Sequence, residues 1–516
     1  MNSDSIRPDS GRWGLALLIA LAAAKFLIHF AVNITGAYGF FRDEFYYIAC
    51  SNHLALGYVD HPPLSIYLLK ISRMILGDSL VAIRFLPALA GALTVFLTGL
   101  IVKELGGGRF ARLFAALCVL LAPLHLGINS YFSMNSFDIL IWTAAAYFIV
   151  LWINWQNPKM WIWLGVLLGF GLQNKISVLW LGFGLAVGLL LTKNRRSFLT
   201  RGPWLAAGIA LLMFLPYIIW QVSNDWPTLQ FMAGATGSKM LEASFLEYLG
   251  GQIMGMHPLL FPVWFAGLVW YLFVRQGERY RALGIIYVSV FALLVISGNA
   301  RSSYLAPAYP MLFASGALVL ERVSGTPLMK YVRVIVVAVI LAGGIAIAPM
   351  ALPVLPVQKY IDYSAALGNE PATDEKHKIG ALPQFFADMH GWDEIVATVV
   401  GVYDNVKSDD QGSWAVLTGN YGVAGAIDFL GREYNLPPAI SGHNNYWFWG
   451  PGDPPPENLI ILGGRLEDYN FCGEVWQAGT TDCTYCMPYE NNNPVFVCMD
   501  LQVDPIKIWP DLKHFK

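Results

Sequence analysis

The sequence is dominated by apolar segments close to the length that crosses a bilayer. About eleven of them, each approaching the roughly 20 residues that a membrane-spanning helix needs, occupy the first 350 residues. Only 13% of the 516 residues are charged, whereas soluble proteins carry about 25%. The chain is therefore predicted to be a polytopic α-helical membrane protein. The segments lie near residues 13–34, 79–102, 110–128, 136–153, 159–173, 176–192, 203–221, 257–274, 281–298, 303–320 and 331–349.

The first apolar segment, Leu15 to Val32, is interpreted as an uncleaved anchor. It is longer than the apolar region of a signal peptide, and many similar segments follow it. Cleavage near Ala24 is the alternative. The formal net charge of −2, without any basic tail, gives no indication of nucleic-acid binding.

Basic residues in the short connections predict the orientation, because such residues collect on the cytoplasmic side. Alternating the segments from a cytoplasmic N-terminus places four basic connections inside: Lys103/Arg109/Arg112, Lys193/Arg195/Arg196/Arg201, Arg275/Arg279/Arg281 and Arg322/Lys330/Arg333. Residues 35–78, 129–135, 174–175, 222–256, 299–302 and everything after 350 then face outside.

The hydrophobic pattern stops at a linker that contains Pro349, Pro353 and Pro356. We therefore expect a transmembrane region at 1–350, with an external first loop at 35–78, and an external domain at 351–516. Helical patterns at 392–406 and 422–434 alternate with strand-like segments at 414–418, 458–462 and 495–499, which predicts a small α/β domain.

Four of the six cysteines cluster in this external domain, at Cys472, Cys483, Cys486 and Cys498. On the external side they predict two disulfides, with three possible pairings. The Cys483-x-x-Cys486 motif as half of a zinc site or as a redox pair is the alternative, but no second such motif or histidine pair accompanies it.

The first external loop is predicted to contain two helices that lie along the membrane surface. Residues 44–56 and 64–76 have apolar faces interrupted by charge, and Pro62-Pro63 separates them. Asp43 and Glu44 stand at the start of this loop. A partly desolvated carboxylate there could take a proton from an attacking hydroxyl. The alternative is that Asp43 caps the helix that follows.

Asp138 is predicted at the external end of the fourth segment, at the same depth as Asp43. A carboxylate facing lipid there would be costly, so a shared external cavity is expected. The alternative is that Asp138 pairs with a basic group such as Lys25 for packing.

Cationic side chains collect at the same predicted face. Lys175 and Arg301 lie in very short turns, Arg84 opens the second segment, and Tyr304 follows Arg301. Cations beside carboxylates at a membrane surface suit a phosphate-bearing lipid. Lys70 and Arg73 read more simply as anchors whose charged ends reach the interface.

Two further features are ambiguous. Asp60 and His61 could ligate a metal ion, but two residues do not make a site. The aromatic run Tyr446-Trp447-Phe448-Trp449 could stack on a sugar ring or anchor the domain at the membrane interface. His257, before Pro258, is expected to be structural.

A set of short motifs resembles the membrane glycosyltransferases of the GT-C type, in the bacterial branch related to protein O-mannosyltransferases and the aminoarabinose transferase of lipid A (glycosyltransferase family 39-like). The resemblance covers roughly residues 10–350. The motifs that carry it are Arg42-Asp43-Glu44, Asp60-His61-Pro62-Pro63-Leu64, Asp138, Asn174-Lys175 and Tyr304-Leu305-Ala306-Pro307-Ala308-Tyr309-Pro310.

The resemblance implies a GT-C-like fold in a bacterial inner membrane, with a periplasmic or extracellular C-terminal domain. It implies inverting transfer from a polyprenyl-phosphate sugar to a lipid, glycan or protein acceptor. Asp43 would be the general base, Asp138 would orient it or assist it, and Lys175 and Arg301 would hold the leaving phosphate. The catalytic candidates are Asp43, Glu44 and Asp138; the substrate-binding candidates are Asp60, His61, Arg84, Lys175, Arg301 and Tyr304.

Two points qualify what the resemblance implies. His61 stands where the aminoarabinose transferase has Lys, and a neutral His would hold a phosphate less strongly, so the donor is left open. Some relatives use a divalent metal near the acidic pair, so a divalent ion is a candidate cofactor.

Two other classes of function are compatible with the composition. A transporter or flippase of a lipid-linked intermediate would place its ionisable groups near the midplane, often in repeated halves, whereas these candidates cluster at one predicted surface and no halves match. The second alternative is a receptor or assembly scaffold that functions through its cysteine-bearing external domain.

Overall fold

The computed structural model describes residues 11–36, 38–298, 300–324, 327–373, 375–407 and 412–516. Two compact units divide the chain. The first, called the helical unit, contains Met1–Thr35, Arg84–Pro216 and Glu242–Val354. The second, called the mixed unit, contains Gly36–Ile83, Tyr217–Leu241 and Leu355–Lys516. Residues 299, 325 and 326 of the predicted connections lie outside the described residues.

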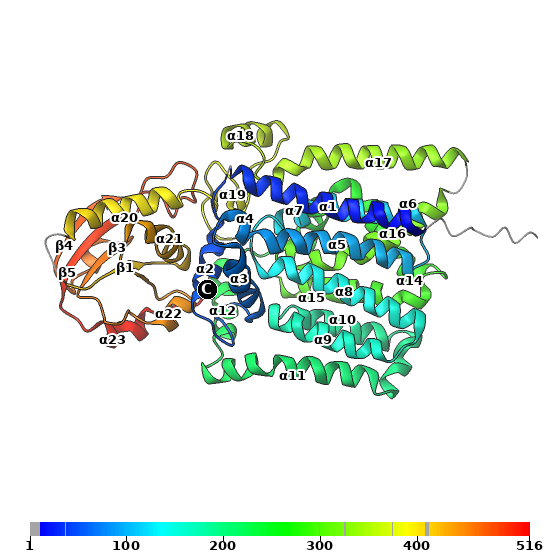
Figure 1. The fold of residues 1–516 in the computed structure, drawn as a ribbon, viewed down its shortest axis with the longest axis horizontal. Coiled ribbons are helices and arrows are strands. Elements are labelled where there is room, and N and C mark those ends of the chain that lie inside the picture. Colours follow the sequence, from blue (N-terminus) through cyan, green and yellow to red (C-terminus); the bar gives the residue numbers. More distant parts are fainter. Residues whose placement is uncertain (1–10, 37, 299, 325–326, 374, 408–411) are drawn as a thin grey trace, which may run out of the picture. The chain divides into compact units, whose positions relative to one another are not determined.

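The helical unit consists of helices joined by short connections, and its long helices run side by side in Figure 1. Its elements are α1 (Gly11–Thr35), α5 (Phe85–Glu104), α6 (Arg109–Leu121), α7 (Pro123–Ile128), α8 (Met134–Trp155), α9 (Lys159–Asn174), α10 (Val178–Leu190), η1 (Lys193–Leu199), α11 (Gly202–Ser223), α13 (Phe245–Gly255), η3 (Pro258–Leu260), α14 (Phe261–Phe273), η4 (Glu278–Tyr280), α15 (Arg281–Ser297), η5 (Ser302–Ala308), α16 (Tyr309–Val323), α17 (Pro327–Ile347) and η6 (Ala348–Met350). The boundary between the units falls inside α11, at Pro216.

All eleven predicted segments are helical, but they differ in length. Among the described residues, seven helices are long and apolar enough to cross a membrane, or eight if the bent pair formed by Phe245–Gly255 and Pro258–Phe273 is one span. This pair bends by 94° where His257 takes a positive φ before Pro258. The segment predicted at 110–128 breaks between α6 and α7 at Ala122-Pro123, because proline cannot continue the α6 hydrogen bonds. The predicted polytopic helical fold is confirmed.

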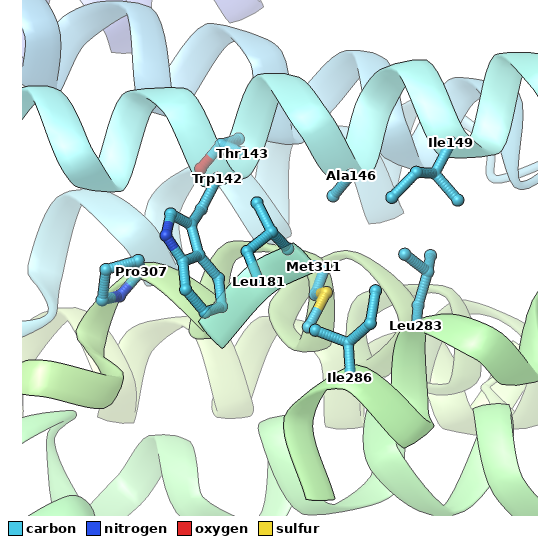
Figure 2. A pocket seen from close by; sticks show the side chains of 9 residues that line it. All are labelled: Trp142, Thr143, Ala146, Ile149, Leu181, Leu283, Ile286, Pro307 and Met311. Carbon is cyan, nitrogen blue, oxygen red and sulfur yellow. The ribbon is translucent and has the colours of Figure 1, made fainter. Parts of the chain in front are cut away.

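Small and apolar residues pack the interior of the helical unit. Gly184 and Gly188 let α10 approach α15 closely: an added Cβ would lie 3.1 Å from the Ile286 Cα and 2.8 Å from the Ala282 carbonyl oxygen. Where these helices meet α8, η5 and α16, Figure 2 shows an almost wholly apolar hollow that is too narrow for water. The hollow is therefore a gap between packed helices and not a binding cavity. It is lined by Trp142, Thr143, Ala146, Ile149, Leu181, Leu283, Ile286, Pro307 and Met311.

The mixed unit combines helices with one five-stranded sheet. Its elements are α2 (Arg42–Asn52), α3 (Leu64–Leu76), α4 (Leu80–Ile83), α12 (Pro227–Gly234), η2 (Ala235–Lys239), α18 (Val357–Ala366), α19 (Gln384–Ala387), α20 (Trp392–Val406), β1 (Trp414–Thr418), α21 (Tyr421–Leu430), η7 (Gly431–Tyr434), β2 (Ala439–Ile440), α22 (Asn445–Trp449), β3 (Asn458–Leu462), η8 (Leu466–Asp468), β4 (Cys472–Thr480), β5 (Pro494–Leu501), α23 (Pro505–Ile508) and η9 (Trp509–Leu512).

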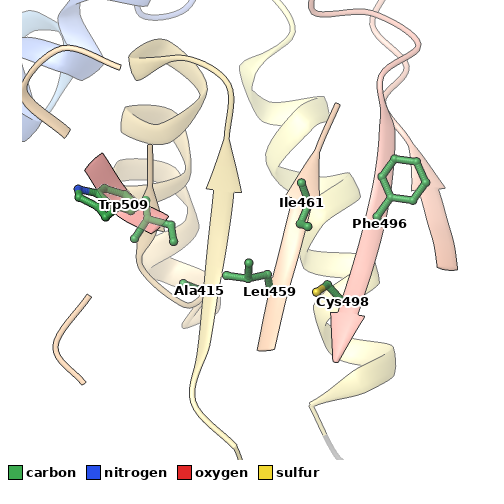
Figure 3. Packing of buried hydrophobic residues seen from close by; sticks show 7 residues of the cluster. Ala415, Leu459, Ile461, Phe496, Cys498 and Trp509 are labelled. Carbon is green, nitrogen blue, oxygen red and sulfur yellow. The ribbon is translucent and has the colours of Figure 1, made fainter. Parts of the chain in front are cut away.

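The strand order is β2-β1-β3-β5-β4. The pairs β1–β2 and β1–β3 are parallel, with Val416 beside Ile460, and the pairs β3–β5 and β5–β4 are antiparallel. Helix α20 lies along one face of the sheet (Figure 1). Buried residues of β1, β3 and β5, including Leu459, Ile461 and Phe496, form an apolar cluster with Trp509 (Figure 3). The predicted C-terminal α/β region is therefore present.

Both predicted disulfides form in the C-terminal region. Cys472 pairs with Cys498, which joins the antiparallel strands β4 and β5, and Cys483 pairs with Cys486. These pairings select one of the three that the spacing allowed.

The segment predicted as the first external loop, residues 35–78, lies in the mixed unit from Gly36 onward. Its two predicted helices are present as α2 and α3, and α3 has the predicted bounds. Aromatic contacts join the loop to the C-terminal region: the Phe45 ring lies 5.4 Å from Trp392, and Phe40 lies 5.2 Å from Phe429. These contacts link residues hundreds of positions apart, which a hydrophobicity pattern does not reveal.

Candidate functional site

Asp43 lies in the first turn of α2, where the positive end of the helix dipole favours a carboxylate. Its side chain is 33% exposed. Asp43 Oδ1 accepts a hydrogen bond of 2.9 Å from the Tyr421 hydroxyl and lies 3.5 Å from the Arg42 Nε. Both contacts use the same oxygen. Asp43 can therefore present Oδ2 to a ligand while Oδ1 is held.

Glu44 has a different environment. It is fully buried, and its Oε2 accepts a hydrogen bond of 2.8 Å from the Phe41 backbone amide, which precedes α2. This contact satisfies one of the amides that a helix start leaves without an intrahelical partner. The capping role that the sequence suggested for Asp43 is thus filled by Glu44.

Arg42 anchors the same turn from a buried position. Its Nη1 donates to the Tyr489 hydroxyl and lies 3.6 Å from the Asp388 carboxylate. Burial raises the pKa of Asp388 to about 6, although Arg42 opposes that shift. Burial likewise raises the pKa of Glu490 to about 7, against the effect of Arg42. Arg42 is therefore the cation of a buried acidic cluster beside Asp43.

Asp60 and His61 follow in the loop before α3. The Tyr46 hydroxyl lies 2.9 Å from Asp60 Oδ1 and 3.0 Å from Asn445 Oδ1. Burial raises the pKa of Asp60. His61 is fully buried, stacks on Tyr47 with ring centres 4.8 Å apart, and directs Nε2 toward Asp60 at 3.9 Å. The Asp60 side chain is 17% exposed, so it is the more accessible of the two.

In the helical unit, Asp138 and Lys175 form a buried ion pair of 3.4 Å. Ser177 donates to Asp138 Oδ2 at 2.9 Å, and the Lys175 Nζ donates to Asn135 Oδ1 at 2.8 Å. The alternative of a basic partner for Asp138 is therefore met by Lys175 and not by Lys25, whose Nζ donates to the His125 carbonyl at 3.1 Å.

Tyr304 belongs to the same group, with its ring centre 5.5 Å from the Lys175 ammonium. Arg301 precedes η5, the helix that carries Tyr304. Arg84 is buried at the start of α5, with 1% of its surface exposed. The structure therefore brings Asp138, Lys175 and Tyr304 together, whereas Asp43, Glu44, Asp60 and His61 belong to the mixed unit.

The donor set around Asp43 does not fit a divalent cation. Its neighbours are a guanidinium and a phenol, and within the described residues no group of three or more His, Cys, Asp or Glu could hold a metal ion. Divalent cations such as Mg²⁺ and Ca²⁺ favour several oxygen ligands, whereas a guanidinium repels them.

Sequence reasoning missed the residues that hold the candidates. Tyr421 lies 378 positions from Asp43, and Asn445 lies 399 positions from Tyr46. Ser177, two residues after Lys175, was within reach of a sequence argument, because a hydroxyl in a short turn can satisfy a buried carboxylate.

Comparison with known proteins identifies relatives of the chain. The family model of dolichyl-phosphate-mannose-protein mannosyltransferases matches residues 60–220. The lipopolysaccharide core galacturonosyltransferase RgtB of Rhizobium johnstonii is 24% identical over 326 residues, covering 59% of this chain and 65% of that protein. The undecaprenyl phosphate-alpha-4-amino-4-deoxy-L-arabinose arabinosyl transferase 1 of Pseudomonas fluorescens is 25% identical over 173 residues, covering 32% of this chain and 30% of that protein.

A solved structure matches almost the whole chain. The crystal structure of ArnT from Cupriavidus metallidurans bound to undecaprenyl phosphate aligns with a TM-score of 0.59 and 13% identity, covering 95% of this chain and 98% of that one. The chain has the GT-C fold. Its fold and part of its sequence are similar to those of GT-C membrane glycosyltransferases, so the predicted resemblance is confirmed.

The sequence matches cover only part of the relatives and part of this chain. The chain spans less than two thirds of the length of either curated relative. The family model covers Asp60, His61, Arg84, Asp138 and Lys175 but begins after Asp43 and Glu44 and ends before Arg301 and Tyr304.

Proposed function

We propose that this protein is an integral-membrane glycosyltransferase that transfers a sugar from a polyprenyl-phosphate donor to an envelope acceptor, on the external face and with inversion. The names of its curated relatives describe transfer of galacturonosyl and aminoarabinosyl groups, and the matching ArnT structure is bound to undecaprenyl phosphate. The observation that carries the proposal is a GT-C fold in which Asp43 has one oxygen held and the other available.

Asp43 is the proposed general base. Its Oδ2 would accept the proton of the acceptor hydroxyl as that oxygen attacks the anomeric carbon opposite the phosphate. One carbon–oxygen bond forms and the bond to phosphate breaks, so the sugar inverts and polyprenyl phosphate leaves. Because Tyr421 and Arg42 engage Oδ1, the carboxylate enters the reaction already oriented.

Lys175 is the proposed contact for the leaving phosphate, whose charge grows as the bond breaks. Its pairing with Asp138 and Asn135 suggests that Asp138 orients this cation instead of assisting the base. Arg301, Arg84 and Tyr304 remain proposed donor-binding residues. Asp60, the more accessible member of its pair, is proposed to hydrogen bond the sugar. The buried His61 would support Asp60, toward which its Nε2 points at 3.9 Å.

The proposal is tested by mass spectrometry of lipid extracts from cells that lack the protein, complemented with wild type or Asp43→Asn. We expect one polyprenyl-phosphate sugar to accumulate in the null strain and to be cleared by wild type. Asp43→Asn should clear it about 10² to 10⁴ times more slowly, the usual contribution of a general base. The accumulated species also shows whether the sugar is a hexose or a pentose.

The matched control is Asp511→Asn, which removes an exposed carboxylate of the same unit. It should clear the lipid as wild type does. Unchanged lipid-linked sugars in the null strain, or full clearance by Asp43→Asn, would refute the proposed reaction or the proposed base, respectively. The first result would favour a transporter or scaffold.

A further inference from the structure

Helix α21 of the C-terminal region packs closely on α2, the helix that begins with Arg42, Asp43 and Glu44. Two glycines on one side of α21 make this approach possible. A Cβ added at Gly425 would lie 2.8 Å from the carbonyl carbon of Phe45, and one added at Gly422 would collide with the Arg42 side chain. Contacts under 3.0 Å require a displacement, so any larger residue would push the helices apart.

The first residue of α21 is the one that reaches Asp43. Asn420 caps the helix by accepting a hydrogen bond of 3.0 Å from the Val423 amide, and the Tyr421 amide donates to His443 Nδ1 at 3.3 Å. The Tyr421 ring packs on Tyr46, with ring centres 4.6 Å apart. These contacts leave the ring little freedom while its hydroxyl donates to Asp43 Oδ1.

We propose that α21 is a positioning element for the base. Tyr421 fixes the Asp43 carboxylate by donating to its Oδ1, and Gly422 and Gly425 set the distance between α21 and α2. The inference rests on the proposed function, because it assigns Tyr421 a role in that reaction. It goes beyond that function, since the C-terminal region then supplies part of the catalytic apparatus. Tyr421 is a positioning residue, because it acts through Asp43.

The direction of the hydrogen bond supports this role. Burial, and secondarily the Asp43 charge, raise the pKa of Tyr421 well above 10, so the phenol stays a donor. A donor to a carboxylate favours its charged form. The other charged groups that act on Tyr421 are Arg42 on α2, Asp60 in the loop before α3 and Glu375. Asp388, after α19, interacts electrostatically with Asp43.

The test uses the full-length protein and does not require the sugar donor. A water-soluble carbodiimide modifies protonated carboxyl groups, so the pH dependence of Asp43 labelling, read by peptide mass spectrometry, reports its ionisation. In Tyr421→Phe the ring packing is kept and the donor is lost. We expect the labelling curve to move to higher pH, because the carboxylate loses a donor, together with roughly tenfold slower lipid clearance.

Three further variants separate positioning from packing. Gly425→Ala should shift the curve in the same direction, because it moves α21 away from α2. Tyr434→Phe, on an exposed tyrosine of η7, should behave as wild type. So should Gly401→Ala, a glycine of α20 whose added Cβ meets nothing within 4 Å.

The outcomes distinguish this inference from the proposed function. If Asp43→Asn abolishes clearance while Tyr421→Phe keeps the wild-type labelling curve, the positioning role is refuted and the glycosyltransferase proposal stands. A shifted curve with wild-type clearance also overturns it, because Tyr421 would then affect Asp43 without serving the reaction. Full clearance by Asp43→Asn would instead refute the proposed base itself.

Discussion

At the scale of single residues, the buried ion pair between Asp138 and Lys175 carries a large desolvation cost. Both side chains are at most 12% exposed, and Asp138 lies on α8, a candidate membrane span. Removing two charges from water is expensive, and an apolar pair of similar size is often as stable. A role for the Lys175 charge in binding phosphate would explain why the position is not apolar.

This cost leads to a prediction for Lys175→Met. The substitution leaves Asp138 buried without its cation, which should reduce the free energy of unfolding by about 3 to 5 kcal/mol. Asp138→Asn/Lys175→Met should recover much of that loss without recovering lipid clearance. Thermal unfolding in detergent and lipid mass spectrometry measure the two effects separately.

The control for this pair is Lys193→Met. Lys193 pairs with Glu278 at 3.1 Å, but its side chain is 91% exposed, so the change should leave the unfolding temperature close to that of wild type. Clearance restored in the double variant would show that Lys175 does not contact the phosphate.

Glu490 carries a second prediction at this scale, on stability and pH. Its pKa rises from 4.5 to about 7, chiefly through burial. The folded state therefore holds this proton more tightly than the unfolded state does. The associated stability is fully present below about pH 4.5 and is lost as pH rises through about 7.

We therefore expect the mixed unit to unfold at lower temperature at pH 8 than at pH 5.5, by on the order of a few degrees. Glu490→Gln should reduce that difference, because the amide keeps an acceptor for Asn420 but cannot ionise. Differential scanning calorimetry at the two pH values measures it, with the exposed Glu467→Gln as control. The assignment fails if both variants show the wild-type pH dependence.

At the scale of elements, local patterns predicted much of what the structure contains. The helices at 64–76 and 392–406 and the strands at 414–418 and 458–462 have the predicted bounds. Strand β4 was missed, because Gly473, Glu474, Gln477 and Gly479 interrupt any regular alternation of apolar side chains. Its place at the sheet edge comes from pairing with β5 and from the Cys472–Cys498 disulfide.

Pairings between distant elements were beyond a single sequence. The sequence indicated Asp138 and Lys175 as separate candidates. They lie 37 positions apart, and only the packing of their helices brings them into contact. The packing of α21 on α2 depends on Gly422 and Gly425. Nothing in the sequence distinguishes these two glycines from others, because their role depends on which residues lie beside them. Residue type therefore indicated the chemistry of the site, and tertiary packing decided the partners.

At the scale of the whole molecule, the number of crossings decides whether the N- and C-termini lie on the same side of the membrane. In the described part of the chain, the eleven predicted segments correspond to seven long helices, one bent pair and the shorter helices α6, α9 and α10. If each segment crosses once, the N- and C-termini lie on opposite sides. With the predicted cytoplasmic N-terminus, the basic connections would face the cytoplasm. The two disulfides would then lie in the oxidising compartment.

We predict that alkaline phosphatase fused after Lys516 is active, because the enzyme requires an external location, and that green fluorescent protein fused there is dark. Fusions after Glu104, next to the first basic connection, should give the reverse result. If one short helix fails to cross, every later connection changes side, and the C-terminal fusion becomes fluorescent. That outcome would place Cys472 and Cys498 in a reducing compartment, where a disulfide between them would not persist. The same pair of reporters therefore tests the count of crossings, the orientation and the setting of the disulfides together.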